Sequence, residues 1–212
     1  MSDDIAVLRK KAEQGDAAAQ FELGDAYFLG QSIDLDYDSA IKWYMKSAEQ
    51  GNADAEFALG FAHTLGAGVE HDLKKAVEWF RKSAEKGNAA AQNSMGCSYY
   101  WGQGVEQDYT EAVKWLRMAA DQGKGIALFN LGNAYAEGHG VERDYRKALS
   151  LYEAALDKGT MIARGRIQTV KELIAEEKRK QRHNSGCGCF GCVILAGIAV
   201  FVLIDAIHVM VQ

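Results

Sequence analysis

The sequence predicts an all-α fold built from repeated helix–turn–helix units, and three observations support this prediction. Landmark residues return every 36 positions along the chain of 212 residues, and the longest such series is Gly15, Gly51, Gly87, Gly123 and Gly159. The chain contains no proline, which agrees with nearly continuous helix. Apolar residues within each period recur at helical spacing. A fixed period of this length without insertions is typical of a solenoid, so we expect a right-handed superhelix of about four helical hairpins.

Each period is expected to form two helices, and the repeat 89–124 illustrates the pattern. Its first helix should run from about Ala89 to Trp101, where Gly102 and Gly104 supply the positive-φ positions that end a helix. Asp108 is placed to cap the second helix, which should end at Gly123. The spacing predicts that the following residues face inward: Ala91, Met95, Tyr99, Ala112, Trp115, Leu116 and Ala119.

Glycines and tryptophans recur inside the predicted helices. A glycine in a helix interior costs about 1 kcal/mol relative to alanine, so a recurring one predicts that two helices cross too closely for a β-carbon. The glycines at this position are Gly24, Gly60, Gly96 and Gly132. Three tryptophans are expected in the core, filling the gap between adjacent repeats: Trp43, Trp79 and Trp115.

The repeated residues form a recognisable motif, which the last repeat shows as Leu131-Gly132, Tyr135, Gly138, Gly140-Val141, Asp144, Lys147-Ala148 and Gly159. This motif resembles that of the Sel-one-like repeat family, a relative of the tetratricopeptide repeats. The resemblance covers about residues 17–160 and implies a scaffold role in complex assembly, signalling or envelope processes. Two positions depart from the motif, namely Ser32 in place of a loop glycine and Leu151 in place of tryptophan.

The predicted organisation has four parts. Residues 1–16 form a capping half repeat, and four repeats follow at 17–52, 53–88, 89–124 and 125–160. Residues 161–183 form a capping helix and a basic linker, with Ala163 and Ile167 on the packed face of a further first helix. Residues 184–212 form a segment rich in cysteine and glycine, followed by a transmembrane helix.

Charge and cysteine usage exclude several classes of function. The chain through Thr160 carries 17 basic and 25 acidic residues, and the remainder carries 7 basic and 4 acidic ones. Nucleic-acid binding requires a basic face, so an acidic repeat region argues against that class of partner. The N-terminus lacks the apolar run of a secretory signal. Cys97 is the only cysteine within the repeats, which favours a reducing compartment for this region.

An apolar segment near the C-terminus predicts a membrane anchor. Cys187–Ile204 contains eighteen residues without a charged side chain, a length at which a transmembrane helix is the default interpretation. The basic residues Lys178, Arg179, Lys180 and Arg182 precede it, so the positive-inside rule places the repeats on the cytoplasmic side. We therefore expect a single-pass, tail-anchored protein that contacts the membrane through residues 187–211. A helix buried in an oligomer interface is the alternative.

The membrane register also has two alternatives. A span at 187–204 leaves Asp205 and His208 at the far interface, where ionisable side chains are unremarkable. A span at 190–211 would place both side chains inside the membrane, where such a pair normally faces a partner helix. The first register is favoured because it avoids this penalty.

The sequence offers no catalytic constellation. His63, His71 and His139 occupy non-equivalent positions of the repeat and do not predict a cluster, so we expect no enzyme, no cofactor and no small-molecule substrate. Three cysteines next to the predicted anchor have three interpretations: small residues where the chain enters the membrane, acceptors of S-acylation, or, together with His183, ligands of a soft metal. These cysteines are Cys187, Cys189 and Cys192, and a metal site is the last of the three interpretations.

Residues one step round from the packed face of the first helices form the candidate recognition surface. They differ from repeat to repeat and include aromatic side chains, which favours a groove for a protein partner. The candidates are Asp25, Phe28, Leu29, Phe61, Leu65, Cys97, Tyr100, Trp101, Asn133 and Glu137. The predicted function is a membrane-tethered scaffold that presents this groove to a cytoplasmic protein. The alternatives are an effector or envelope-stress factor at a membrane target, and an accessory protein with a Cys/His metal site.

Overall fold

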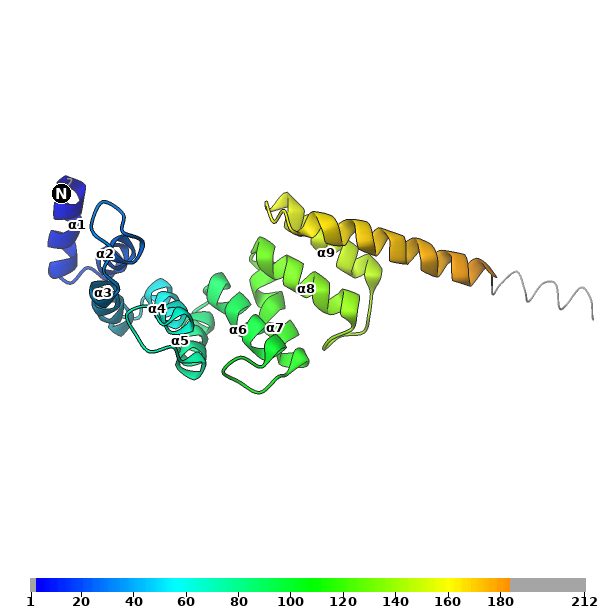
Figure 1. The fold of residues 1–212 in the computed structure, drawn as a ribbon, viewed down its shortest axis with the longest axis horizontal. Helices are drawn as coiled ribbons and strands as arrows, with labels where there is room; N and C mark the ends of the chain where they lie inside the picture. The colour runs from blue at the N-terminus through cyan, green and yellow to red at the C-terminus, as the bar shows by residue number, and fades with distance from the viewer. Residues whose placement is uncertain (1–2, 184–212) are drawn as a thin grey trace, which may run out of the picture. The chain divides into compact units, whose positions relative to one another are not determined.

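A computed structural model describes residues 3–183, and this part of the chain is helical apart from short turns (Figure 1). The labelled helices are α1 (Asp3–Glu13), α2 (Ala17–Leu29), α3 (Tyr37–Glu49), α4 (Ala53–Leu65), α5 (Leu73–Glu85), α6 (Ala89–Trp101), α7 (Tyr109–Asp121), α8 (Gly125–Glu137) and α9 (Tyr145–Asp157), and a further helix follows at 163–183. We call α2, α4, α6 and α8 the first helices, and α3, α5, α7 and α9 the second helices. The helix predicted from Ala89 to Trp101 has these bounds in the structure.

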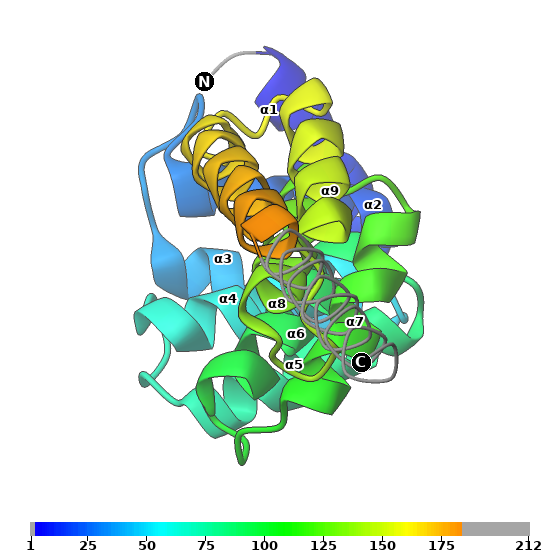
Figure 2. The same ribbon diagram turned by 90° about the vertical axis from the view of Figure 1, so that its right-hand side faces the viewer.

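The helices pack in sequence order, as a solenoid requires. Each first helix contacts the second helix of its own repeat, and each second helix contacts the first helix of the next repeat. α1 covers α2 at the N-terminal end of the series. In the view turned by 90° the successive pairs lie behind one another (Figure 2). The predicted all-helical solenoid is confirmed for the described residues.

The ends of the helices follow the repeated motif. Asp36, Asp72, Asp108 and Asp144 cap the four second helices, and each carboxylate accepts hydrogen bonds from backbone N–H groups of the first turn. The first helices end at glycines in the left-handed conformation, as Gly102 does with φ 67°. Both features were predicted from the spacing.

The interior glycines allow the two helices of each hairpin to cross closely. A β-carbon at Gly24 would lie 2.6 Å from the ring of Tyr44, and one at Gly60 would lie 2.6 Å from the ring of Phe80. Leu116 and Tyr152 occupy the same place opposite Gly96 and Gly132. The predicted close crossing is therefore confirmed, and a large buried side chain fills the space that each glycine leaves.

The tryptophans are less buried than predicted. Trp43, Trp79 and Trp115 are half-buried, and each packs against a cluster formed by the first helix of its own repeat and the helix before it. Lys46 and Lys82 lie over the rings of Trp43 and Trp79, with 4.1 Å from Nζ to each ring centroid. The tryptophans do bridge adjacent repeats, but the next residue in the sequence (Tyr44 after Trp43, for example) takes the central position.

Ser32 adopts the conformation of the glycine that it replaces. Its φ is 61°, and among the described residues other than glycine it alone has a positive φ. In later repeats this position lies against the start of the preceding second helix: a β-carbon at Gly68 would lie 2.7 Å from the carbonyl oxygen of Tyr37. The residue that would correspond to Tyr37 for Ser32 is Met1, outside the described residues. Because its φ is positive and it has a β-carbon, Ser32 carries the backbone cost of the left-handed region.

The chain divides into two compact units, residues 1–167 and 168–212. The first unit contains the repeats and the start of a further helix, in which Ala163 is buried as predicted and Ile167 is half-buried. The second unit is helical over residues 168–183. None of the helices within residues 3–183 has the length and apolar character needed to cross a membrane. The predicted span at 187–204 lies outside the described residues.

Candidate functional site

Nine of the ten candidate residues line one of two hollows between successive first helices. The first hollow lies between α2 and α4 and has a volume of about 230 Å³. We call it the aromatic groove, and it is lined by Phe21, Asp25, Phe28, Leu29, Tyr44, Asp54, Phe57, Ala58 and Phe61. Four of these residues (Asp25, Phe28, Leu29 and Phe61) were predicted from the sequence. Leu65, the tenth candidate, is exposed but lines neither hollow.

Aromatic rings form the walls of the aromatic groove. The ring centroids of Phe28 and Phe61 are 6.5 Å apart, and those of Phe57 and Phe61 are 6.4 Å apart and stacked. Phe61 keeps 44% of its surface exposed, so the rings are open to solvent. Tyr44, which is only 2% exposed, forms the floor. The groove therefore presents a continuous apolar surface that the repeats themselves do not cover.

A carboxylate joins the floor of the aromatic groove. The hydroxyl of Tyr44 donates a hydrogen bond of 2.6 Å to Asp25. Burial raises the pKa of Asp25, the hydrogen bond from Tyr44 lowers it, and the neighbouring carboxylates of Asp54 and Glu22 raise it further. The net direction is upward, because burial and two like charges outweigh one hydrogen bond.

The second hollow lies between α6 and α8 and is smaller, with a volume of about 90 Å³. We call it the polar pocket, and it is lined by Cys97, Tyr100, Trp101, Leu116, Asn130, Asn133, Glu137 and Arg166. Five of these residues were predicted: Cys97, Tyr100, Trp101, Asn133 and Glu137. The sequence predicted a recognition surface that includes Tyr100, but Tyr100 is only 7% exposed, whereas Trp101 is 66% exposed.

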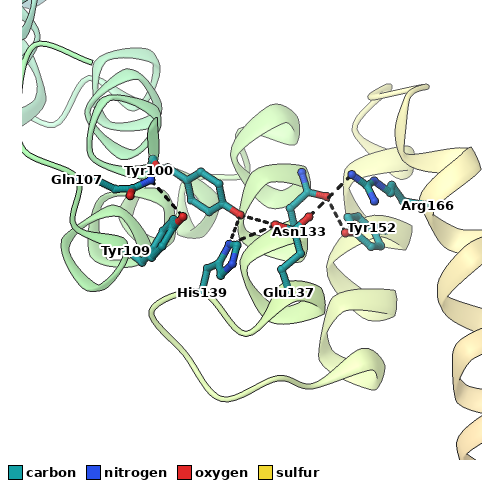
Figure 3. Close-up of polar contacts among 8 residues, drawn as sticks. All are labelled: Tyr100, Gln107, Tyr109, Asn133, Glu137, His139, Tyr152 and Arg166. Atoms are coloured by element: carbon teal, nitrogen blue, oxygen red, sulfur yellow. Dashed lines mark hydrogen bonds and ion pairs between the residues drawn. The ribbon is translucent and has the colours of Figure 1, made fainter. Parts of the chain in front are cut away.

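The hydroxyl of Tyr100 points between Glu137 and His139 in the polar pocket (Figure 3). It donates a hydrogen bond of 2.6 Å to Glu137 and lies 2.7 Å from Nδ1 of His139. Since the hydroxyl has one proton and Glu137 receives it, Nδ1 of His139 is the donor to the Tyr100 oxygen. Burial raises the pKa of Tyr100, and the hydrogen bond to Glu137 raises it further. The phenol therefore remains a neutral donor.

Further contacts surround this polar network. The ring of His139 stacks on Tyr109, with 4.3 Å between centroids. Arg166 lies 4.0 Å from the carboxylate of Glu137, and the hydroxyl of Tyr152 donates to Asn133 at 2.7 Å. Most polar groups of the pocket thus satisfy one another, which makes it a cross-link between repeats.

Sequence reasoning missed some of these residues. His63, His71 and His139 were not expected to form a cluster, but His139 belongs to a different network, with Tyr100 and Glu137. Tyr100 is a tyrosine only in its own repeat, the equivalent positions being Phe28, Thr64 and Ala136. A repeat-by-repeat search for such unique polar residues would have identified the network.

The remaining candidate chemistry lies elsewhere. Nδ1 of His63 lies 3.1 Å from the backbone carbonyl oxygen of Glu70, and Nδ1 of His71 lies 2.9 Å from that of Thr64. Within residues 3–183, no group of three or more histidines, cysteines and acidic residues is arranged to hold a metal ion. Burial raises the pKa of Cys97 to about 11, so its thiol is a weak nucleophile at neutral pH. Cys187, Cys189 and Cys192 lie outside the described residues.

The helix pairs define an α/α helical-repeat protein with two hollows between its first helices. The Sel1 repeat model matches the chain four times, at residues 17–52, 53–88, 89–124 and 125–160, and the chain belongs to this family. Sel1-repeat proteins commonly mediate protein–protein interactions. No curated protein matches the chain.

Solved structures show the same fold. The chain is 42% identical to c5321, a protective antigen of uropathogenic Escherichia coli with an SLR fold, at a TM-score of 0.72 over 75% of this chain and 34% of that one. It is 36% identical to a Sel1 repeat protein from Oxalobacter formigenes, at a TM-score of 0.73 over 77% of this chain and 65% of that one. Cysteine rich protein B of Helicobacter pylori is 21% identical, at a TM-score of 0.50 over 64% of this chain and 98% of that one, and shows the fold alone. The chain thus spans about a third and just under two thirds of the first two proteins.

Proposed function

We propose that this chain is a non-enzymatic scaffold that binds a partner protein in the aromatic groove. The observation that carries the proposal is the open row of rings on α2 and α4, where Phe61 and Leu29 are 44% and 56% exposed. A folded protein rarely leaves a contiguous apolar surface without a use, and buried aromatic anchors supply much of the binding energy at protein interfaces. Membership of a family whose repeats commonly bind proteins supports the same role.

We also propose that the chain is anchored in a membrane. The apolar run at 187–204 and the basic residues before it support a C-terminal anchor with the repeats on the cytoplasmic side. A chain that ends at His183 should leave the membrane fraction, while the full-length chain should resist a carbonate wash. Retention of the shortened chain on membranes would show that another segment carries the anchor.

The scaffold role is tested by capturing partners in the host cell after cross-linking. The full-length chain is compared with Phe61→Ser and with a control, Met118→Ser, because Met118 on α7 is similarly exposed at 46% and lines neither hollow. We expect the wild type and the control to capture the same proteins, and Phe61→Ser to lose them. Capture of the same proteins by a folded Phe61→Ser variant would rule out the aromatic groove as the binding site.

Trp101 provides a second arm of the same experiment. Its side chain is 66% exposed at the edge of the polar pocket, so Trp101→Ala should leave the melting temperature nearly unchanged. If the partner extends along the first helices to this pocket, the variant should weaken capture by about 2 kcal/mol, as for other aromatic anchors. Unchanged capture would confine the partner to the aromatic groove.

A further inference from the structure

The aromatic groove has room for one or two side chains of a partner. Its volume of about 230 Å³ compares with ~30 Å³ for each water molecule in the liquid, so the groove holds the space of several waters. The walls come from Phe28 on α2 and from Phe57 and Phe61 on α4, and the floor is the ring of Tyr44. A side chain that enters the groove would therefore meet ring faces from two successive repeats.

The charged side chains that line the groove are acidic. Asp25 receives its hydrogen bond from the Tyr44 hydroxyl, and Asp54 receives one of 2.7 Å from the amide of Asn88. Both donors are neutral, and no basic side chain is among the described residues that line this groove. Glu22 adds a third negative charge near Asp25. The negative potential of the groove is therefore not balanced from within.

The aromatic walls and the carboxylates together favour one kind of side chain in the groove. A purely apolar segment would cover the carboxylates without compensating their charge, which is costly. An acidic segment would be repelled. A lysine or arginine side chain matches both features, because its alkyl stem packs on apolar surface, its cationic head is attracted to ring faces, and the same head can reach a carboxylate.

We propose, as an extension of the proposed scaffold function, that the aromatic groove binds a segment of a partner protein in which an arginine or lysine stands next to large apolar side chains. The stem of the basic residue packs on the exposed sides of the Phe28 and Phe61 rings, and its head lies near Asp25 and Asp54. The adjacent apolar side chains cover Leu29 and Phe57. In this arrangement the negative charge of the groove determines the specificity, and the aromatic rings supply most of the binding energy.

The test uses three short fluorescein-labelled peptides with one apolar frame and arginine, glutamine or glutamate at the same positions. The full-length chain is held in nanodiscs of zwitterionic lipid, so that a basic peptide is not attracted to the lipid surface, and empty nanodiscs serve as the blank. We expect the arginine peptide to bind about tenfold more tightly than the glutamine peptide, and the glutamate peptide to bind most weakly. The preference should decrease as salt is added, because the groove is open to solvent.

Two sets of variants separate charge from shape. The double variant Asp25→Asn, Asp54→Asn should bind the arginine and glutamine peptides equally, whereas the control Asp121→Asn, Asp157→Asn changes the same charge at exposed positions outside the groove and should keep the tenfold preference. Phe61→Ala should weaken binding of every peptide. Melting curves of each variant establish that it is folded.

The outcomes distinguish this inference from the scaffold function itself. Equal binding of the three peptides, a preference that survives the double variant, or no binding of the arginine peptide would overturn the basic-segment proposal. The scaffold function fails by a different result, namely unchanged capture of host proteins by Phe61→Ser. A groove that binds the three peptides equally but loses them in Phe61→Ala would leave the scaffold intact with an apolar partner.

Discussion

The aromatic groove and the polar pocket occupy the same place in the repeat, two repeats apart, and differ in their side chains. Six positions of the repeat contribute a side chain to each hollow. The pairs are Asp25 and Cys97, Phe28 and Tyr100, Leu29 and Trp101, Tyr44 and Leu116, Ala58 and Asn130, and Phe61 and Asn133. The repeated backbone therefore provides a hollow at this place, and the side chains decide whether it stays open or becomes a cross-link.

The difference lies in where the polar groups find their partners. In the polar pocket Glu137 receives the hydroxyl of Tyr100 and lies near Arg166, so its charge is partly balanced within the chain. In the aromatic groove Asp25 and Asp54 receive hydrogen bonds only from neutral donors within residues 3–183, beside rings that solvent can reach. A hollow whose polar groups hydrogen-bond to one another contributes to stability, whereas a hollow with unbalanced charge and open apolar surface is suited to binding.

The largest expected effect comes from disturbing the loop that joins the two helices of repeat 3. Gly104 has φ 75°, and a β-carbon there would clash with the carbonyl of Leu73 in the preceding repeat. Gly104→Ser gives repeat 3 the residue that repeat 1 has at Ser32. We expect it to lower the free energy of unfolding by about 3 kcal/mol, from strain at positive φ and overpacking together. Thermal unfolding followed by circular dichroism measures this loss, and an unchanged melting temperature would mean that the repeats can separate at this loop.

A second prediction removes the cross-link from the polar pocket. Tyr100→Phe makes this position equivalent to Phe28, and the hydrogen bonds to Glu137 and His139 disappear. Because Tyr100 is buried but Glu137 is partly exposed, we expect a loss of about 1–2 kcal/mol. Tyr109→Phe is the matched control, since its hydroxyl contacts only the exposed Gln107, and it should cost less than about 0.5 kcal/mol. Equal effects of the two variants would contradict the cross-link.

The sequence was sufficient to predict the helices, because capping aspartates and loop glycines act locally and recur at one period. It also placed nine of ten candidate residues at the hollows, because one step round a helix is a fixed rotation. It failed where contacts come from a neighbouring repeat. Besides Tyr109 of its own repeat, His139 of the next repeat packs against the ring of Tyr100 and helps to bury it.

The tryptophans show a second limit of sequence reasoning. Trp115 and Leu116 both lie on the inner side of α7, and helical spacing alone does not decide which is central. The decision comes from Gly96 on the other helix, where the missing β-carbon admits Leu116 at close range. Such pairs of glycine and opposing side chain could be predicted only once the crossing point of the two helices was known.

A smaller effect should distinguish the loop of repeat 1 from that of repeat 3. Ser32→Gly removes the cost of a side chain at positive φ and should raise the free energy of unfolding by about 1 kcal/mol. The gain is reduced because glycine also makes the unfolded chain more flexible. A lower melting temperature would show that the hydroxyl of Ser32 makes a stabilising contact that outweighs the backbone strain.

The smallest expected change in stability concerns Asp25, and it is the most informative for function. Burial raises the pKa of Asp25 in the folded protein, so the folded state retains this proton more tightly than the unfolded chain. Asp25 therefore favours folding at acidic pH, and its contribution is lost as the pH rises through the raised pKa. Asp25→Asn should remove the loss of stability that occurs when the carboxyl ionises, because an amide does not ionise. The amide oxygen can still accept a hydrogen bond from the Tyr44 hydroxyl, as Asn133 accepts one from Tyr152.

We expect Asp25→Asn to be more stable than the wild type at neutral pH by at most about 0.5 kcal/mol, since solvent screens a half-exposed carboxylate. The advantage should disappear at a pH where the wild-type carboxyl is protonated, which melting curves at several pH values would measure. The same variant should bind the arginine peptide more weakly. Stability and affinity would then change in opposite directions, as expected for a charge retained for binding at a cost to the fold. A variant that loses stability at neutral pH would instead make Asp25 a structural partner of Tyr44.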